Sequence, residues 1–144
     1  MQKALIPFLV IATAGLLVAE DTQFSSLMKS MNTAYDALRQ ADFMSNQRSI
    51  RNAERLGTSY EELIEFWRQQ KVVKAVSLSE TGKSTAVQLA DAMHSGNAEQ
   101  AAALVKAIGA TCHSCHEAYR EKLPDGKYRI KSEDPTRRVT AKTP

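Results

Sequence analysis

The stretch that decides this fold is Cys112-His113-Ser114-Cys115-His116, near the carboxyl end of a 144-residue chain. Its spacing, C-x-x-C-H, is the attachment sequence of a covalent c-type haem. Residues three and four apart share one face of a helix, so both thiols can add to the vinyl groups of one porphyrin while the imidazole points at its iron. The motif therefore predicts one covalent heme c per chain, held by Cys112 and Cys115, with His116 as the proximal iron ligand.

C-x-x-C alone is less specific, because it also occurs in thioredoxin-like redox pairs and in half-sites for zinc. The chain has only two cysteines, so no second pair can complete a zinc site. No strand–helix–strand pattern surrounds the motif, which argues against a thioredoxin-like setting. A chance match at a helix terminus and a structural disulfide between the two cysteines are the remaining alternatives.

The amino terminus has the pattern of an export signal. Lys3 is followed by a mostly apolar run over residues 4–19, which ends at Ala19 before two acidic residues. This pattern predicts a secretory signal peptide over residues 1–19, cut after Ala19. The run is shorter than the roughly 20 apolar residues that span a bilayer. Leu17, two residues before Ala19, is larger than the small residue that is ideal at this position of a cleavage site. Retention as an uncleaved membrane anchor therefore stays open. We expect a periplasmic protein, because bacteria attach haem c outside the cytoplasmic membrane.

The remaining chain has the size of one domain. We expect a bundle domain over residues 20–126 and a basic carboxyl-terminal tail over residues 127–144. The chain has 19 Lys+Arg and 16 Asp+Glu, a net charge of +3, and the excess of basic residues lies in the tail. The mixed charge of the bundle does not favour nucleic-acid binding. We interpret the tail as solvated and disordered, with docking to an acidic partner or to lipid headgroups as the alternative.

Helical periodicity dominates the rest of the sequence. It predicts four helices, over about residues 22–41, 46–70 and 77–95 and from residue 97 to before Pro124, with a bend or break in the second at Gly57. Ser77 and Asn97 each stand three residues before a Glu or Gln, which is capping-box spacing, and Gly96 is a stop signal. Four amphipathic helices with short connections pack most simply as an all-α antiparallel four-helix bundle. We expect the haem near one end of the bundle, on the C-terminal helix.

Several other side chains have predicted places. We expect Tyr60, Trp67 and Tyr119 to pack in the core or on the haem, His113 to be exposed, and His94 to end the third helix. A side chain at Gly109, one turn before Cys112, would press on the porphyrin. The carboxylates are spread over helix surfaces, so we expect no acid–base catalytic site and no enzyme activity.

The stretch from Gly109 to Arg120, with the sequence GATCHSCHEAYR, resembles the end of the cytochrome c′ family, the class II cytochromes c. In that family G-A-x-C-x-x-C-H-x-x-[YF]-R is typical. The resemblance implies a four-helix bundle, one haem per chain, and a role in electron transfer or gas binding. It also implies that Arg120 lies beside the proximal histidine.

The same resemblance addresses the second axial position of the iron. Low-spin members of the family place a methionine sulfur from the first helix on the iron, in a Leu-Met-Lys setting similar to that of Met28 here. High-spin members leave this position open, and many carry an arginine one turn earlier, where this chain has Phe24. Met28 is thus the expected distal ligand. Ligation by Met31 and an open iron site are the alternatives, since methionine is also a common core residue.

The resulting expectation is a one-electron carrier that exchanges electrons with periplasmic redox proteins. The alternative is a cytochrome c′-like protein that binds nitric oxide or carbon monoxide at a five-coordinate iron. A third interpretation is a small subunit of a larger redox complex, docked through the basic tail. A homodimer through the first two helices also stays open, because family members often form one.

Overall fold

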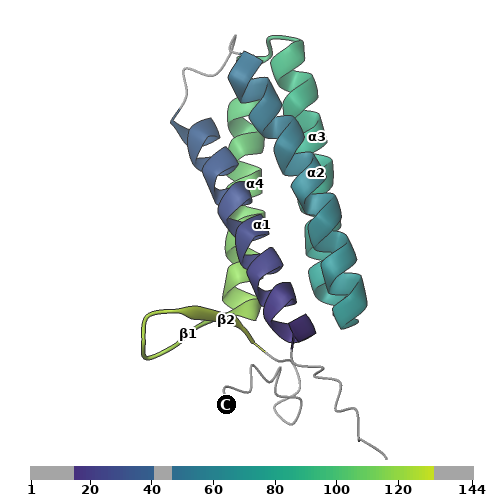
Figure 1. Cartoon of the computed structure of the whole chain (residues 1–144). Helices are drawn as coiled ribbons and strands as arrows, with labels where there is room; N and C mark the ends of the chain where they lie inside the picture. Colours follow the sequence, from purple (N-terminus) through teal and green to yellow (C-terminus); the bar gives the residue numbers. More distant parts are fainter. Residues whose placement is uncertain (1–14, 41–46, 132–144) are drawn as a thin grey trace, which may run out of the picture.

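The computed structural model describes residues 15–40 and 47–131. It contains four long helices and one hairpin (Figure 1): α1 (Gly15–Arg39), α2 (Gln47–Gln70), α3 (Val73–His94), α4 (Ala98–Tyr119), β1 (Arg120–Lys122) and β2 (Tyr128–Ile130). The helices pack antiparallel, which confirms the predicted four-helix bundle with the C-x-x-C-H motif in its last helix. Most of the predicted signal peptide and the tail after Lys131 lie outside the described residues.

The core is made of apolar side chains that recur at helical spacing on all four helices. One leucine or isoleucine on each helix, Leu38, Leu56, Leu89 and Ile108, is wholly buried. Burying such a side chain contributes about 1.5–3 kcal/mol. Val87 of α3, by contrast, is half exposed.

The connection between α2 and α3 is shorter than the sequence indicates. Lys71 adopts a left-handed conformation with φ of 61°, and its N–H donates to the carbonyl of Arg68. The N–H of Val72 donates to the carbonyl of Trp67 at 3.1 Å. Main-chain bonds of this kind close a helix as a glycine commonly does. The predicted start at Ser77 is therefore wrong, because α3 begins one turn earlier at Val73.

The predicted break in the second helix is also wrong, because α2 runs unbroken through Gly57. Gly57 is buried, and the nearest heavy atom to a Cβ placed there would be Val87 Cγ2 of α3, at 4.0 Å. The packing of α2 on α3 thus compensates the low helix propensity of this glycine.

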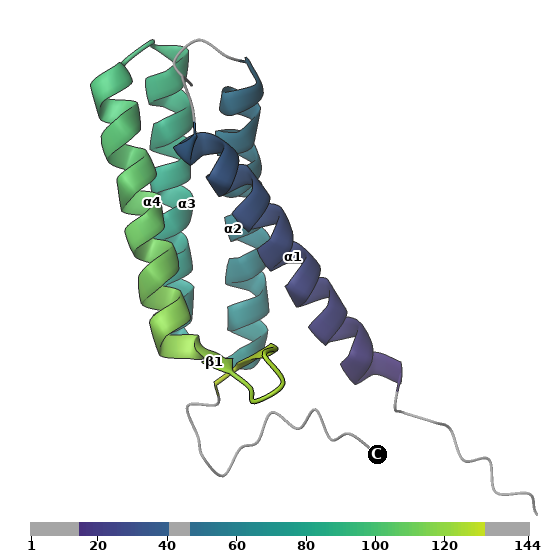
Figure 2. The same cartoon turned by 90° about the vertical axis from the view of Figure 1, so that its left-hand side faces the viewer.

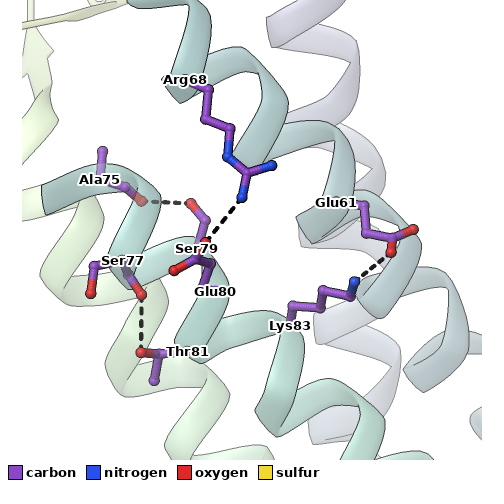
Figure 3. A network of polar contacts seen from close by, with 8 residues as sticks. All are labelled: Glu61, Arg68, Ala75, Ser77, Ser79, Glu80, Thr81 and Lys83. Carbon is purple, nitrogen blue, oxygen red and sulfur yellow. Dashed lines mark hydrogen bonds and ion pairs between the residues drawn. The ribbon is translucent and has the colours of Figure 1, made fainter. Parts of the chain in front are cut away.

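The outer edges of α2 and α3 are joined by ion pairs (Figure 3). Arg68 reaches Glu80 at 3.2 Å, and Lys83 reaches Glu61. These side chains are about half exposed, so each pair contributes only about 0–1 kcal/mol. Packing of the apolar faces, rather than these pairs, holds the two helices together.

The start of α4 follows its prediction. Asn97 Oδ1 accepts a hydrogen bond from the Gln100 N–H at 3.1 Å, and Asn97 Nδ2 donates to Gln100 Oε1. Gly96 precedes the cap with φ of 70°, as expected for a helix stop. The capping side chain satisfies an N–H that would otherwise lack a partner at the helix start.

The hairpin that follows α4 was not predicted. α4 ends at Tyr119, and the next residues form an antiparallel hairpin in which Glu121 lies opposite Arg129. The Lys131 N–H donates to the Tyr119 carbonyl at 2.7 Å, which ties the hairpin back to the helix end. The prediction of continued helix to Pro124 is wrong. Strand β2 also lies in the segment expected to be a disordered tail.

α1 is the least enclosed helix. It packs on α2 and has few contacts with α4. In Figure 2 the amino-terminal half of α1 leans away from the other three helices. This half lies at the end of the bundle where α4 meets the hairpin. Within residues 15–40 and 47–131, no helix is long and apolar enough to cross a membrane.

Candidate haem-binding site

A cavity of about 680 Å³ lies between α1 and α4, and α2, α3 and the hairpin complete its wall. Its volume falls in the range of cofactor pockets, roughly 300–1,000 Å³. α1 contributes residues between Phe24 and Tyr35, and α4 contributes Cys112 and its neighbours. The divergence of α1 from α4 is therefore what makes room for a large ligand.

All four residues that the sequence singled out for haem binding line this cavity. Cys112, Cys115 and His116 face it from α4, and Met28 lines it from α1. Each of the four is partly buried. The two thiols are not joined by a disulfide in this structure. One cavity thus brings together a thiol pair, an imidazole and a thioether from the two ends of the chain.

Burial sets the protonation of the α4 groups. Burial raises the pKa of Cys112, and burial followed by the charge of Cys112 raises the pKa of Cys115 to about 11. Burial lowers the pKa of His116, and Arg120 and His113 lower it further. His116 is therefore neutral at physiological pH, which is the form that binds iron.

Tyr60 of α2 connects the motif to the bundle core. Its hydroxyl oxygen lies 3.6 Å from Cys112 Sγ, and burial raises the pKa of this phenol far above its ordinary value. The ring occupies the space beside Gly82 of α3, where a Cβ would lie 2.3 Å from two ring atoms. A glycine at position 82 is thus required for the Tyr60 ring to occupy this position.

Gly109 lies at a close approach of α4 to α1, and contact of a side chain there with a porphyrin stays a prediction. A Cβ at this position would lie 2.1 Å from the hydroxyl oxygen of Tyr35 of α1. The missing side chain makes room for that hydroxyl, one turn before Cys112.

An aromatic cluster stands at the cavity end nearest the hairpin. The rings of Phe24 and Phe66 are 4.4 Å apart, and Trp67 lies 5.0 Å from Phe66 and 5.2 Å from Tyr119. Phe24, Trp67 and Tyr119 line the cavity. Trp67 is 2% exposed, and its Nε1 has no hydrogen-bond partner among the described residues.

The hairpin adds wall residues that the sequence analysis missed. The guanidinium of Arg120 stacks over the Tyr128 ring at 4.5 Å, and Arg129 donates to Glu121 at 2.8 Å. Both arginines, Tyr128 and Ile130 line the cavity. The turn sequence Pro124-Asp125-Gly126 before an aromatic and a β-branched residue was the signal that could have predicted a hairpin.

The other histidines lie outside the cavity. His113 is exposed, as predicted, and lies 3.9 Å from Glu117. His94 is in the last turn of α3, and its Nε2 is 3.4 Å from a Glu54 carboxylate oxygen. Within the part of the chain that the structure describes, no three His, Cys, Asp or Glu side chains gather to hold a metal ion.

The residues present fit a covalent haem. Apolar and aromatic side chains form most of the cavity wall, as a porphyrin plate requires. The thiol pair and His116 have the spacing for attachment and proximal ligation, and Arg120 and Arg129 are available to the haem carboxylates. The buried indole N–H of Trp67 has no acceptor among the described residues, and a haem could supply one.

These features define a four-helix-bundle protein with a cavity whose residues fit a covalent haem. Residues 51–120 match the family described as Cytochrome C', a span from α2 through the C-x-x-C-H motif to Arg120. This segment of the chain is therefore similar to the cytochrome c′ family. No curated protein and no solved structure matches the chain.

Proposed function

We propose that this protein is a periplasmic one-electron carrier whose single haem is held by Cys112 and Cys115 and ligated by His116 and Met28. The observation that carries the proposal is that Met28 and His116 line one cavity from facing elements, α1 and α4. When bound, haem would supply an iron that exchanges one electron, and ligation by a thioether together with histidine would favour the ferrous state. The chain's task would then be to hold the iron with His116 and Met28 in both oxidation states.

The surroundings of Met28 support this role. Phe24, one turn earlier, stacks in the aromatic cluster, so this stretch of α1 has a ring where a charged side chain would stand in the gas-binding alternative. The part of the cavity wall that α1 contributes around Met28 is mixed, with Phe24 and Met31 as apolar neighbours and Ser25, Lys29 and Asn32 as polar ones. A sheltered thioether near the haem is a suitable ligand for electron transfer.

The second candidate function is binding of nitric oxide or carbon monoxide at an open iron. It is favoured by one observation: Met31 also lines the cavity and is more deeply buried than Met28. Two methionines at adjacent turns are compatible with both acting as packing groups, which would leave the distal position free.

The deciding experiment is the optical spectrum of the purified haem protein, oxidised and reduced, followed by carbon monoxide. We expect a low-spin spectrum with a methionine–iron charge-transfer band and no response to the gas. Met28→Ala should abolish the band and admit carbon monoxide. Met31→Ala removes a second cavity methionine, and Met93→Ala removes a buried methionine outside the cavity wall; both should keep the band. A wild-type spectrum that is high-spin and shifts on adding the gas would reverse the order of the two functions.

The basic hairpin supports docking to acidic redox partners. Arg120, Lys122, Lys127, Arg129 and Lys131 stand against Glu121 and Asp125 in residues 120–131. Opposite charge on a donor or acceptor would speed the encounter beside the haem. Electron-transfer rates that do not fall as the salt concentration rises would contradict this part of the proposal.

A further inference from the structure

The indole of Trp67 is a buried donor with no acceptor in the described protein. The side chain is 2% exposed, and Nε1 has no hydrogen-bond partner among the described residues. Leaving such a donor unpaired is costly, and folded proteins pair the large majority of buried polar groups. Because Trp67 lines the cavity, we expect the acceptor for its Nε1–H to belong to the ligand that occupies the cavity.

The position of Trp67 along α2 indicates which part of the haem it meets. Tyr60 lies seven residues earlier on the same face of α2, and its hydroxyl is 3.6 Å from Cys112 Sγ. Two helical turns separate the two residues, about 10 Å along the helix axis. Cys112 marks a vinyl-bearing edge of the porphyrin, so Trp67 lies toward the opposite edge, which carries the propionate groups.

We propose that the Trp67 Nε1–H donates a hydrogen bond to a haem propionate and makes Trp67 a positioning residue for the cofactor. The inference rests on haem attachment in the proposed function but holds for a low-spin or a high-spin iron. Carboxylate oxygens are the hydrogen-bond acceptors that the edge of a haem offers to a buried N–H. The bond fixes the propionate edge, as the thioethers fix the vinyl edge.

Other charged groups also face this end of the cavity. They are Lys29 of α1, Arg120 of β1 and Arg129 of β2. His116 of α4 is titratable but neutral at physiological pH, and α3 contributes the uncharged Leu78 and Ser79 to the cavity wall. These cations attract the propionates in every variant considered below. A difference between variants at Trp67 therefore reports the indole donor.

The test compares haem-loaded wild type with Trp67→Phe, which keeps a ring and removes the donor, and with Phe66→Leu. Phe66 belongs to the same aromatic cluster but is not part of the cavity wall. A hydrogen bond to a carboxylate lowers its pKa, and the charge of a propionate alters the reduction potential. We expect the pH midpoint of the potential change to rise by about one unit in Trp67→Phe and to stay fixed in Phe66→Leu. An unchanged midpoint in Trp67→Phe, or an equal shift in Phe66→Leu, would overturn the proposal.

A second measurement needs no variant, because Trp67 is the only tryptophan in the chain. Its single indole N–H can be followed in the wild-type haem protein by hydrogen exchange. We expect slow exchange that accelerates as the pH falls through the propionate step. Fast exchange with no change at that step would refute the hydrogen bond even if Trp67→Phe does not fold. Attachment of haem is read separately from the absorption spectrum, so failure of this inference is distinguishable from failure of the proposed function.

Discussion

The two ends of the bundle differ in how their helices meet. At one end, which we call the packed end, Leu38, Leu56 and Leu89 are wholly buried between the helices. At the other, the cavity end, Phe24, Met28 and His116 are only partly buried around a cavity of about 680 Å³. The protein's own side chains fill the packed end, whereas the cavity end leaves space beside buried side chains such as Trp67. In the proposed function a haem occupies that space.

The largest expected effect compares one residue from each end. Leu89→Ala should lower the free energy of unfolding by about 2–5 kcal/mol, because it removes a wholly buried side chain from the packed end. Phe24→Ala removes a partly exposed ring that packs on Phe66 and Trp67. Its loss of free energy should be smaller, because less of the side chain is buried. The ring contacts themselves contribute about 0.5–1.5 kcal/mol of it. Urea unfolding of the haem protein measures both. Equal losses would mean that the two ends are packed alike.

An intermediate effect is expected where the packed core reaches the haem motif. Gly82→Ala should destabilise the protein by about 1–3 kcal/mol, because the new Cβ would overlap the ring of Tyr60. It should also move the Tyr60 hydroxyl away from Cys112 and alter the haem absorption. Gly57→Ala is the matched control, since its Cβ has ordinary space beside Val87. That variant should stabilise α2 by roughly 0.5–1 kcal/mol. A harmless Gly82→Ala would show that Tyr60 is not tightly seated.

The smallest effect concerns the hairpin at the cavity end. The hydrogen bond from Arg129 holds the pKa of Glu121 below its ordinary value of 4.5. A carboxyl with a lowered folded pKa contributes stability above its ordinary pKa, and the contribution is lost as the pH falls through the lowered value. Amide exchange in β2, corrected for its intrinsic pH dependence, should therefore speed up in acid while α3 at the packed end stays protected. Glu121→Gln should remove this pH dependence, and an unchanged profile in that variant would exclude Glu121 as its cause.

The sequence predicted the features that depend on short-range chemistry. The C-x-x-C-H spacing pointed to Cys112, Cys115 and His116, which share one wall of the cavity, and Asn97 caps α4 as its spacing indicated. The Leu-Met-Lys setting pointed to Met28, which lines the same cavity, and its ligation of iron stays a prediction.

The features that were missed depend on packing, pairing or backbone geometry that the residue pattern of one segment does not signal. Gly57 is held in an unbroken helix by packing on α3, and Lys71 closes α2 in a left-handed conformation that its residue type does not signal. Gly109 accommodates Tyr35, which is 74 residues earlier in the sequence. β2 is three residues long and depends on pairing with β1, so its own periodicity is too short to detect.

The placement of the cavity walls has a consequence for the order of assembly. α2, α3 and α4 are joined by very short connections, so each can pack on its predecessor with little loss of chain entropy. The wall formed by α1 and α4 instead joins the first and last helices, and contacts of such large sequence separation form slowly. We expect a three-helix unit to assemble first, with the Cys112–Cys115 pair still reachable from the side that α1 will cover. Closure of α1 would then be the step that encloses the haem.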